Sequence, residues 1–153
     1  MLKSIQNIFR HRNQEVSDSS EIYQRELAYA SLLVEVIKSD DKFDDREREK
    51  LFDVLSKKLK IRDDELKNFA ELAKQKSDES TSLYEFTREI NDKYEYDEKV
   101  KLIEDLWRIA YSDGQLDKYE DYVIRKIADL IYVTHSDFIK SKLSVKNQPT
   151  SKV

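Results

Sequence analysis

Cysteine is absent from this chain of 153 residues, and glycine and proline occur once each, as Gly114 and Pro149. Without cysteine there is no disulfide, no zinc–thiolate or iron–sulfur site and no thiol catalyst. A single glycine excludes the glycine-rich loops that bind nucleotide phosphates. So few turn residues also argue against a β-sandwich or a Rossmann sheet.

The chain also lacks an excess of positive charge and a long apolar run. Its 28 basic and 32 acidic residues give a formal net charge of −4, whereas nucleic-acid-binding domains are usually basic, so no nucleic-acid partner is expected. No apolar run approaches the roughly 18 residues of a membrane span, so no transmembrane segment is expected. The N-terminus lacks the apolar region of a secretory signal, and we therefore expect a cytoplasmic protein.

Apolar residues recur at helical spacing through most of the chain, which predicts an all-α, single-domain bundle of about seven helices. The predicted helices cover about 20–39, 44–59, 64–76, 83–94, 96–112, 117–132 and 135–143. The helix at 96–112 has the widest apolar face, so we expect it to be central and largely buried. Within it, Trp107 and Tyr111 are expected either in the core or at an aromatic spot that binds a partner. Residues 77–82 read as a surface loop.

The two ends of the chain are expected to lie outside this domain, as a short helix and loop at 1–19 and a disordered tail at 144–153. The short helix, about 2–12, would carry one apolar face, made of Leu2, Ile5, Ile8 and Phe9. Such a helix can pack on the body of the protein or on a neighbouring molecule, or it can be a weak anchor at a membrane surface. Its short length favours packing.

An internal repeat is the most informative feature of the sequence. Residues 39–47 read SDDKFDDRE and residues 112–120 read SDGQLDKYE, at an offset of 73. Both fit the pattern S-D-x-x-[F/L]-D-x-x-E. The matching apolar positions around them predict two units, about 20–76 and 82–143, each a helix, an acidic turn, a helix, a turn and a helix. Two such units would face each other across one core.

The repeat places three carboxylates at each acidic turn, namely Asp40, Asp44 and Glu47 in the first and Asp113, Asp117 and Glu120 in the second. Helix capping explains four of them, since Asp44 and Asp117 fall at predicted N-caps with a glutamate three residues later. Asp40 and Asp113 fall at the C-terminal ends of helices instead, where a negative charge is unfavourable.

Carboxylates spaced four and three residues apart around a tight turn can also converge on one cation. Ligands that are all oxygen suit Ca²⁺, Mg²⁺ or Mn²⁺. The spacing is too short for an EF-hand, whose loop has eleven steps from its first aspartate to its glutamate. From spacing alone, capping, metal binding and a protein-contact surface all remain open.

The chain resembles the TerB-like family, the domains similar to tellurite resistance protein B, and most closely its stand-alone, uncharacterised branch. The resemblance covers about residues 20–143 and is carried by 32–51, 61–69 and 106–130. It implies an all-α bundle of two related halves, a fold shared with the N-terminal domain of a membrane-anchored J-domain co-chaperone. It also implies divalent-metal binding at the acidic turns, carried over to Asp40, Asp44, Glu47, Asp113, Asp117 and Glu120. Asp41 departs from the glycine usual at the first turn.

The family name does not imply tellurite chemistry. Reduction of an oxyanion needs a thiol or a redox cofactor, and the chain has no cysteine. We expect a non-enzymatic module that binds a divalent cation through its acidic turns and docks other proteins, in a response to tellurite, metal or envelope stress. The alternative is a pure protein-interaction domain whose acidic residues only cap helices. A third reading is a hydrolase-like enzyme that uses paired carboxylates for acid–base chemistry.

Overall fold

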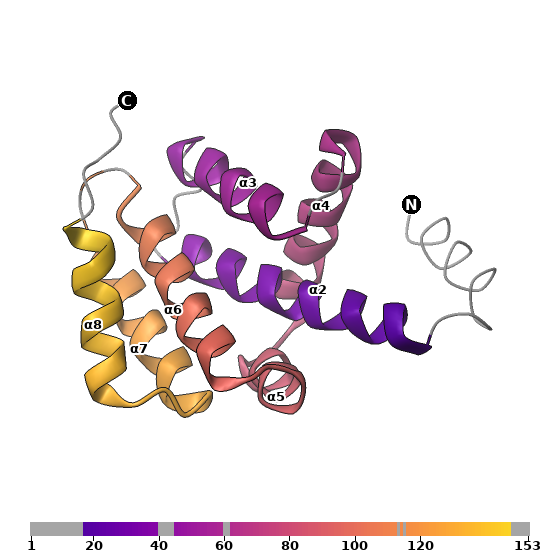
Figure 1. Cartoon of the computed structure of the whole chain (residues 1–153). Helices are drawn as coiled ribbons and strands as arrows, with labels where there is room; N and C mark the ends of the chain where they lie inside the picture. Colours follow the sequence, from indigo (N-terminus) through magenta and orange to yellow (C-terminus); the bar gives the residue numbers. More distant parts are fainter. Residues whose placement is uncertain (1–16, 40–44, 60–61, 113, 115, 148–153) are drawn as a thin grey trace.

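The computed structural model describes residues 17–39, 45–59, 62–112, 114 and 116–147, and within them the chain forms seven α-helices and no strand. The all-α, single-domain expectation is therefore confirmed. The helices are α2 (Ser17–Lys38), α3 (Asp45–Leu59), α4 (Asp63–Glu79), α5 (Tyr84–Lys93), α6 (Tyr96–Ala110), α7 (Lys118–Leu130) and α8 (His135–Lys146) (Figure 1). None of the described helices has the length and apolar character that a membrane crossing requires. The helix expected at 2–12 lies outside the described residues.

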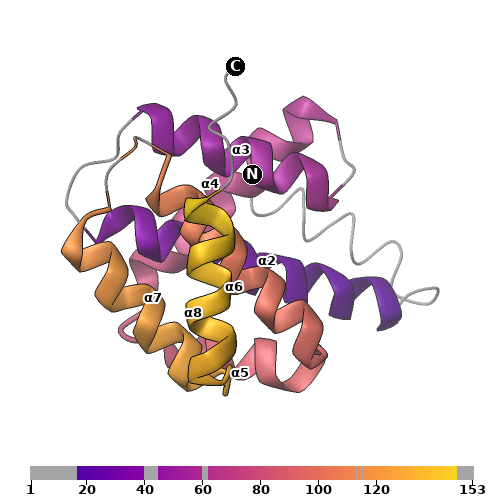
Figure 2. The ribbon, with the colours of Figure 1, turned by 60° about the vertical axis from the view of Figure 1, so that its left-hand side comes forward.

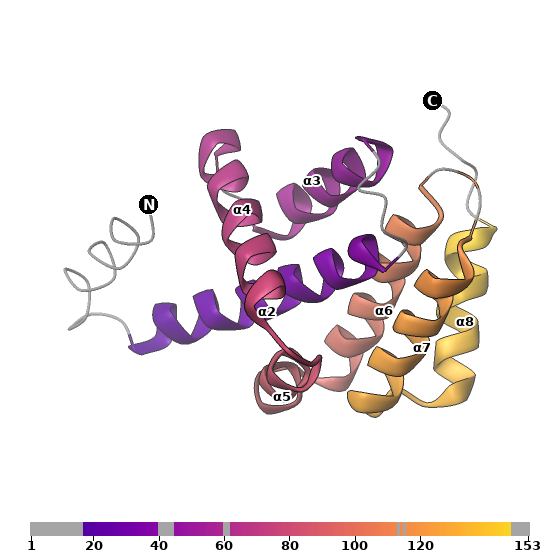
Figure 3. The same cartoon turned by 180° about the vertical axis from the view of Figure 1, so that it is seen from behind.

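Helix α2 runs across the molecule and packs against α3, α4, α5, α6 and α7. Figures 1 and 3 show it passing between the α3–α4 pair and the helices of the second half. A helix with neighbours on most of its sides must be apolar on most of its sides. The sequence meets this condition over 28–37, where Glu35 is the only residue that is not buried.

Helix α6 is the second central element, as its wide apolar face predicted. It packs against α8, α2, α3 and α7, and its buried residues include Leu102, Ile103, Leu106, Trp107, Ile109 and Ala110. The Trp107 side chain is fully buried, with its ring centroid 5.4 Å from that of Phe138 on α8. Of the two readings for Trp107, core packing is therefore the correct one.

The two predicted units share one packing feature. The most extensive contacts of α2 are with α4, and those of α6 are with α8, so in each half the first helix packs on the third (Figure 2). The serine that opens each acidic motif makes the same bond. The Ser39 hydroxyl donates to the Val36 carbonyl at 2.7 Å, and the Ser112 hydroxyl donates to the Ile109 carbonyl at 2.7 Å. The two bonds agree with the predicted repeat, and the duplication itself stays a prediction.

Helix α4 ends later than the sequence suggested. The polar run from residue 77 reads as a loop, but α4 continues to Glu79 and Ser77 is 2% exposed. The Ser77 hydroxyl donates to the Glu35 carboxylate and accepts a 2.9 Å bond from the Lys38 ammonium group. A polar residue that faces a polar patch on α2 carries no apolar signal, so periodicity alone misplaced the end of the helix.

The other helix boundaries lie close to the predicted ones, with two differences at the ends of the domain. Helix α2 begins at Ser17, three residues before the predicted start. Helix α8 continues to Lys146, and Val145 is buried against the core. The expected tail of 144–153 is therefore helical in its first residues because one apolar side chain anchors it.

Candidate functional site

The second acidic turn leads directly into α7. Asp117 is the N-cap of this helix, with extended backbone angles (φ −79°, ψ 140°), and its carboxylate Oδ1 accepts a 2.7 Å bond from the Tyr119 N–H. Gly114 precedes it with a positive φ of 85°, a conformation that glycine adopts without strain. The capping role predicted for Asp117 is therefore present in the structure.

Two motif glutamates are buried at matching positions. Glu47 and Glu120 are each the third residue of their helix, α3 and α7, and are 3% and 2% exposed. Among the described residues, the only other buried carboxylate is Asp105. Glutamate is rarely buried unless its charge is compensated, and the N-terminus of a helix compensates part of a negative charge. Both halves therefore hold a carboxylate out of water at the start of their second helix.

Three of the six predicted ligands, Asp40, Asp44 and Asp113, lie outside the described residues. Within the part of the chain that the structure describes, no three His, Asp or Glu side chains form a group that could hold a metal ion. Metal binding by Asp40, Asp44 and Glu47, and by Asp113, Asp117 and Glu120, stays a prediction.

The segments that carry the two motifs meet at one side of the molecule. A pocket of about 370 Å³ is lined by Arg46, Glu49, Lys50 and Asp53 from α3 and by Ser112 from the second motif. Figure 2 shows the start of α3 beside the end of α6. The fold thus brings the two segments that carry the acidic motifs to one face of the molecule. The sequence alone did not show whether these segments lie together.

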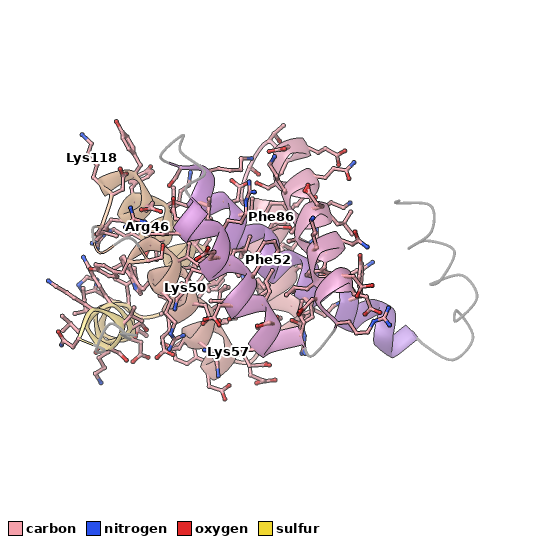
Figure 4. The ribbon with its side chains drawn as sticks, turned by 90° about the horizontal axis from the view of Figure 1, so that it is seen from above. Arg46, Lys50, Phe52, Lys57, Phe86 and Lys118 are labelled. Carbon is pink, nitrogen blue, oxygen red and sulfur yellow. The ribbon has the colours of Figure 1, made fainter. Side chains whose placement is uncertain are left out.

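This pocket continues into a second one of about 560 Å³ between α3 and α6, and the two share Lys50 and Asp53. We call the two together the α3–α6 groove. The second pocket is lined by Tyr29, Lys50, Asp53, Val54, Lys57, Lys58, Glu98, Lys101, Asp105 and Arg108. Figure 4 shows Arg46, Lys50 and Lys57 along one edge of α3, with Phe52 on the opposite edge.

A hydrogen-bonded triad forms the floor of the groove. The buried Tyr29 phenol donates to Oδ2 of Asp105, and the Arg108 guanidinium Nη1 donates to Oδ1 of the same carboxylate at 2.6 Å. Burial raises the pKa of Tyr29 well above its usual value, and the negative charge of Asp105 raises it further. Tyr29 therefore keeps its proton and remains a hydrogen-bond donor.

Lys58 covers the Tyr29 ring at the side of the groove. Its ammonium nitrogen lies 4.3 Å from the Tyr29 ring centroid and 5.2 Å from that of Tyr94, a cation–π arrangement. The same nitrogen is 3.7 Å from Oε2 of Glu26. Burial raises the pKa of Glu26, while Lys58 and Arg25 act in the opposite direction. Lys58 is thus held in one place by two rings and a carboxylate.

The groove carries charged groups of both signs. Its lining has six basic side chains and four acidic ones. Two of the basic side chains, Lys58 and Arg108, also lie 3.7 Å from Glu26 and 3.9 Å from Glu104, so basic and acidic groups balance.

The Asp53 carboxylate lies near two ammonium groups. Its Oδ2 is 3.7 Å from Nζ of Lys50 and 3.5 Å from Nζ of Lys57. Lys101 has no ion-pair partner among the described residues.

Sequence reasoning missed this groove. The signal on α3 is visible, because Arg46, Lys50 and Lys57 are four and seven residues apart and so share one face of a helix. Lys101 and Arg108 share a face of α6 in the same way. What the sequence could not show is that these two faces, about fifty residues apart, lie against each other.

An apolar groove lies on the other edge of α3, against α4. It has a volume of about 880 Å³, and its apolar lining consists of Val34, Leu51, Phe52, Leu66 and Ala70. Charged side chains of both helices surround this apolar strip, among them Arg48, Glu49, Lys67 and Glu71. Helix α3 therefore separates a charged groove from an apolar one.

Comparison with known proteins gives one match. A family model described as tellurite resistance protein TerB matches residues 26–143. No curated protein and no solved structure matches the chain. The matched region begins within α2 and ends within α8, so it contains most of the first predicted unit, all of the second and both motif segments.

Proposed function

Since the chain belongs to the TerB family of tellurite resistance proteins, we propose that it is a non-enzymatic docking module that binds a divalent cation at its acidic turns. The cation is Ca²⁺, Mg²⁺ or Mn²⁺, because the predicted ligands are all oxygen atoms. The docked partners are other proteins, and the setting is a response to tellurite, metal or envelope stress.

The burial of Glu47 and Glu120 carries the cation part of the proposal. A carboxylate that leaves water loses its hydration, and a bound cation is one way to offset that loss. These two buried carboxylates belong to the matched acidic motifs, and each lies in the first turn of its helix, α3 or α7. A purely structural role in a capping box does not require burial, because a glutamate at the third position of a helix can bond to the N-cap backbone at the surface as well.

The two grooves beside α3 support the docking part. Apolar grooves rimmed by polar residues are typical of sites that contact other proteins. In the α3–α4 groove the half-buried Phe52 lies among charged side chains, and the α3–α6 groove offers charged groups. A partner that contacts α3 could use both.

The alternative function is a pure interaction domain whose acidic residues only cap helices. The bond from the Tyr119 N–H to Asp117 favours it, because this carboxylate already has a structural use. The two functions differ in one measurable property, which is whether the metal-stripped protein binds a divalent cation.

Calorimetric titration of the metal-stripped protein with Ca²⁺ and then Mn²⁺ tests the proposal. The test variant is Asp113→Asn/Asp117→Asn, because asparagine caps a helix about as well as aspartate but is a poorer cation ligand. The matched control is Asp92→Asn/Asp129→Asn, which removes the same charge from two exposed positions. We expect saturable binding that the test variant loses and the control keeps. No binding in the millimolar range, or equal binding in both variants, would leave capping as the role of the motif.

A further inference from the structure

We propose that residues 2–12 occupy the α3–α4 groove of the same chain. These residues precede α2 and lie outside the part of the chain that the structure describes. Their apolar residues, Leu2, Ile5, Ile8 and Phe9, fall on one face at helical spacing. The sequence left open whether this face packs on the body of the protein, on a neighbouring molecule or at a membrane surface. The inference names the first of these and the place, and it requires neither a bound cation nor a partner protein.

The α3–α4 groove has apolar side chains beneath it and one partly exposed ring. Val34, Leu51, Leu66 and Ala70 are buried, whereas Phe52 is only half-buried and packs against the core. The volume of about 880 Å³ lies within the range of about 300–1,000 Å³ that is usual for ligand sites. An apolar segment in this groove would remove the rest of the Phe52 ring from water, which is favourable.

Charge does not select the occupant of this groove. Its charged lining has four acidic side chains and three basic ones, namely Glu49, Asp53, Asp63, Glu71, Arg48, Lys67 and Lys74. Asp53 also lies near Lys50 and Lys57, so the two signs are close to balance. The groove therefore neither attracts nor repels a basic segment strongly, and apolar contact and reach decide what occupies it.

The chain before α2 is long enough to reach the groove. Helix α2 begins at Ser17 and rises about 25 Å from there to Val34, which lines the groove. The eight residue steps from Ser17 back to Phe9 can span about 26–29 Å. Figures 1 and 3 show that the first turns of α2 lie on the α4 side of the molecule. A segment that turns back along α2 can therefore bring Phe9 level with Val34.

The size of the groove favours a tethered segment over a separate molecule. Thirteen residues line it, whereas a stable interface between two proteins uses about 20–30 residues on each side. Contact of this extent would hold a separate chain only weakly. A segment joined to α2 by a short linker has an effective concentration in the millimolar range, so weak contact is enough to hold it. A docking partner that contacts Phe52 then has to displace residues 2–12.

The experiment exploits the lack of cysteine in the chain, because every thiol can then be chosen. The test variant is Ile8→Cys/Ser56→Cys, in which Ser56 is an exposed residue that lines the groove. The matched control is Ile8→Cys/Asn68→Cys. Asn68 is exposed on α4 outside the groove lining, and its neighbour Phe69 contacts Tyr23 of α2 at 5.6 Å between ring centroids. The control thiol thus lies within easy reach of the segment without lying in the groove.

Disulfide formation in the full chain is followed at micromolar protein with oxidised glutathione and EDTA, by non-reducing electrophoresis and mass spectrometry. We expect an intramolecular disulfide that forms at least about fivefold faster in the test variant than in the control, because the segment is concentrated at the groove. Adding Ile5→Asp/Phe9→Asp to both variants should reduce the test rate to the control rate. Circular dichroism of all four chains should be alike, since these changes lie before α2 or at exposed positions.

Three results would overturn the inference. Equal rates in the test variant and the control would leave the groove open to a separate partner. Disulfide-linked dimers in place of the intramolecular product would assign it to the segment of a second copy. A fast test rate that persists with Ile5→Asp/Phe9→Asp would show that tethering alone, and not the apolar face, brings the thiols together. Because no divalent cation or partner is present, none of these results depends on the proposed function.

Discussion

The Tyr29 phenol on α2 donates a hydrogen bond to the Asp105 carboxylate on α6, which joins residues 76 positions apart in the sequence. Both side chains are buried, and both belong to the central helices of the bundle. The bond lies at the floor of the α3–α6 groove, so it links the packing of the core to the geometry of the proposed docking site.

Removing this bond should destabilise the protein. In Tyr29→Phe the Asp105 carboxylate stays buried and keeps only Arg108 as its hydrogen-bond donor. Leaving a buried polar group without one of its partners costs about 1–3 kcal/mol. Urea unfolding should show a loss of this size, whereas Tyr122→Phe, at an exposed position of α7, should change the free energy of unfolding little. An equal, small effect of both substitutions would contradict the role assigned to the bond.

Alkaline pH should unfold the protein through its buried tyrosines. Burial raises the pKa of Tyr23 from 10.0 to about 12, and it raises the pKa of Tyr29 and Tyr94 as well. In the unfolded chain the same groups lose their protons near pH 10, so the unfolded state binds fewer protons than the folded one above that pH. The free energy of unfolding should therefore fall as pH rises above about 10.

Tyrosinate absorbance followed together with circular dichroism checks this expectation. Tyr23, Tyr29 and Tyr94, whose pKa values are raised by burial, should ionise only as the helices are lost. Ionisation of these three tyrosines while the helical signal is unchanged would contradict the prediction.

Tyr132 occupies a backbone conformation that favours glycine. It follows the end of α7 with a φ of +63°, and its N–H bonds to the Asp129 carbonyl while the Val133 N–H bonds to the Ala128 carbonyl. This is the Schellman arrangement, in which a residue with a side chain is strained by about 1–2 kcal/mol relative to glycine. Its side chain is 74% exposed, so little packing offsets the strain.

The substitution Tyr132→Gly should therefore raise the free energy of unfolding by about 1 kcal/mol, after the greater freedom of glycine in the unfolded chain is allowed for. Tyr132→Ala keeps a Cβ in the same conformation and should give no such gain. Thermal unfolding of the two variants measures the difference. A gain in both would mean that the side chain, rather than the backbone, carries the strain.

The cap of α7 can be tested apart from metal binding. Asp117→Ala removes the acceptor of the Tyr119 N–H and should destabilise the protein by about 1 kcal/mol. Asp117→Asn keeps an acceptor and should be close to neutral in stability. Urea unfolding in EDTA makes the comparison, and equal losses in both variants would show that the charge of Asp117, and not its cap bond, stabilises the helix.

Most of the fold could be predicted from apolar periodicity. The helices could be predicted because the apolar residues of each form a continuous face. The central position of α6 could be predicted from the width of its apolar face. The end of α4 was misplaced because Ser77 is buried by polar contacts with Glu35 and Lys38, which periodicity does not register. The end of α8 was misplaced because Val145 is a single apolar residue in a polar run.

The candidate site could be predicted only in part. The acidic motifs are visible as a local repeat, and the cap at Asp117 follows from its position before a helix. The burial of Glu47 and Glu120 and the meeting of α3 with α6 are tertiary properties. The groove therefore depends on packing between α3 and α6, and no pattern in the sequence pairs these two segments.

The central position of α2 has a consequence for how the chain folds during synthesis. This helix is made before α3–α8, yet its buried side chains, among them Leu33 and Ile37, pack against helices from both halves. When α4 has emerged from the ribosome, the side of α2 that later meets α6 still faces water. Contacts of such large sequence separation slow folding and expose apolar surface to chaperones and proteases in the meantime. We therefore expect that neither half folds by itself and that cutting the chain between α5 and α6 leaves two fragments with incomplete cores.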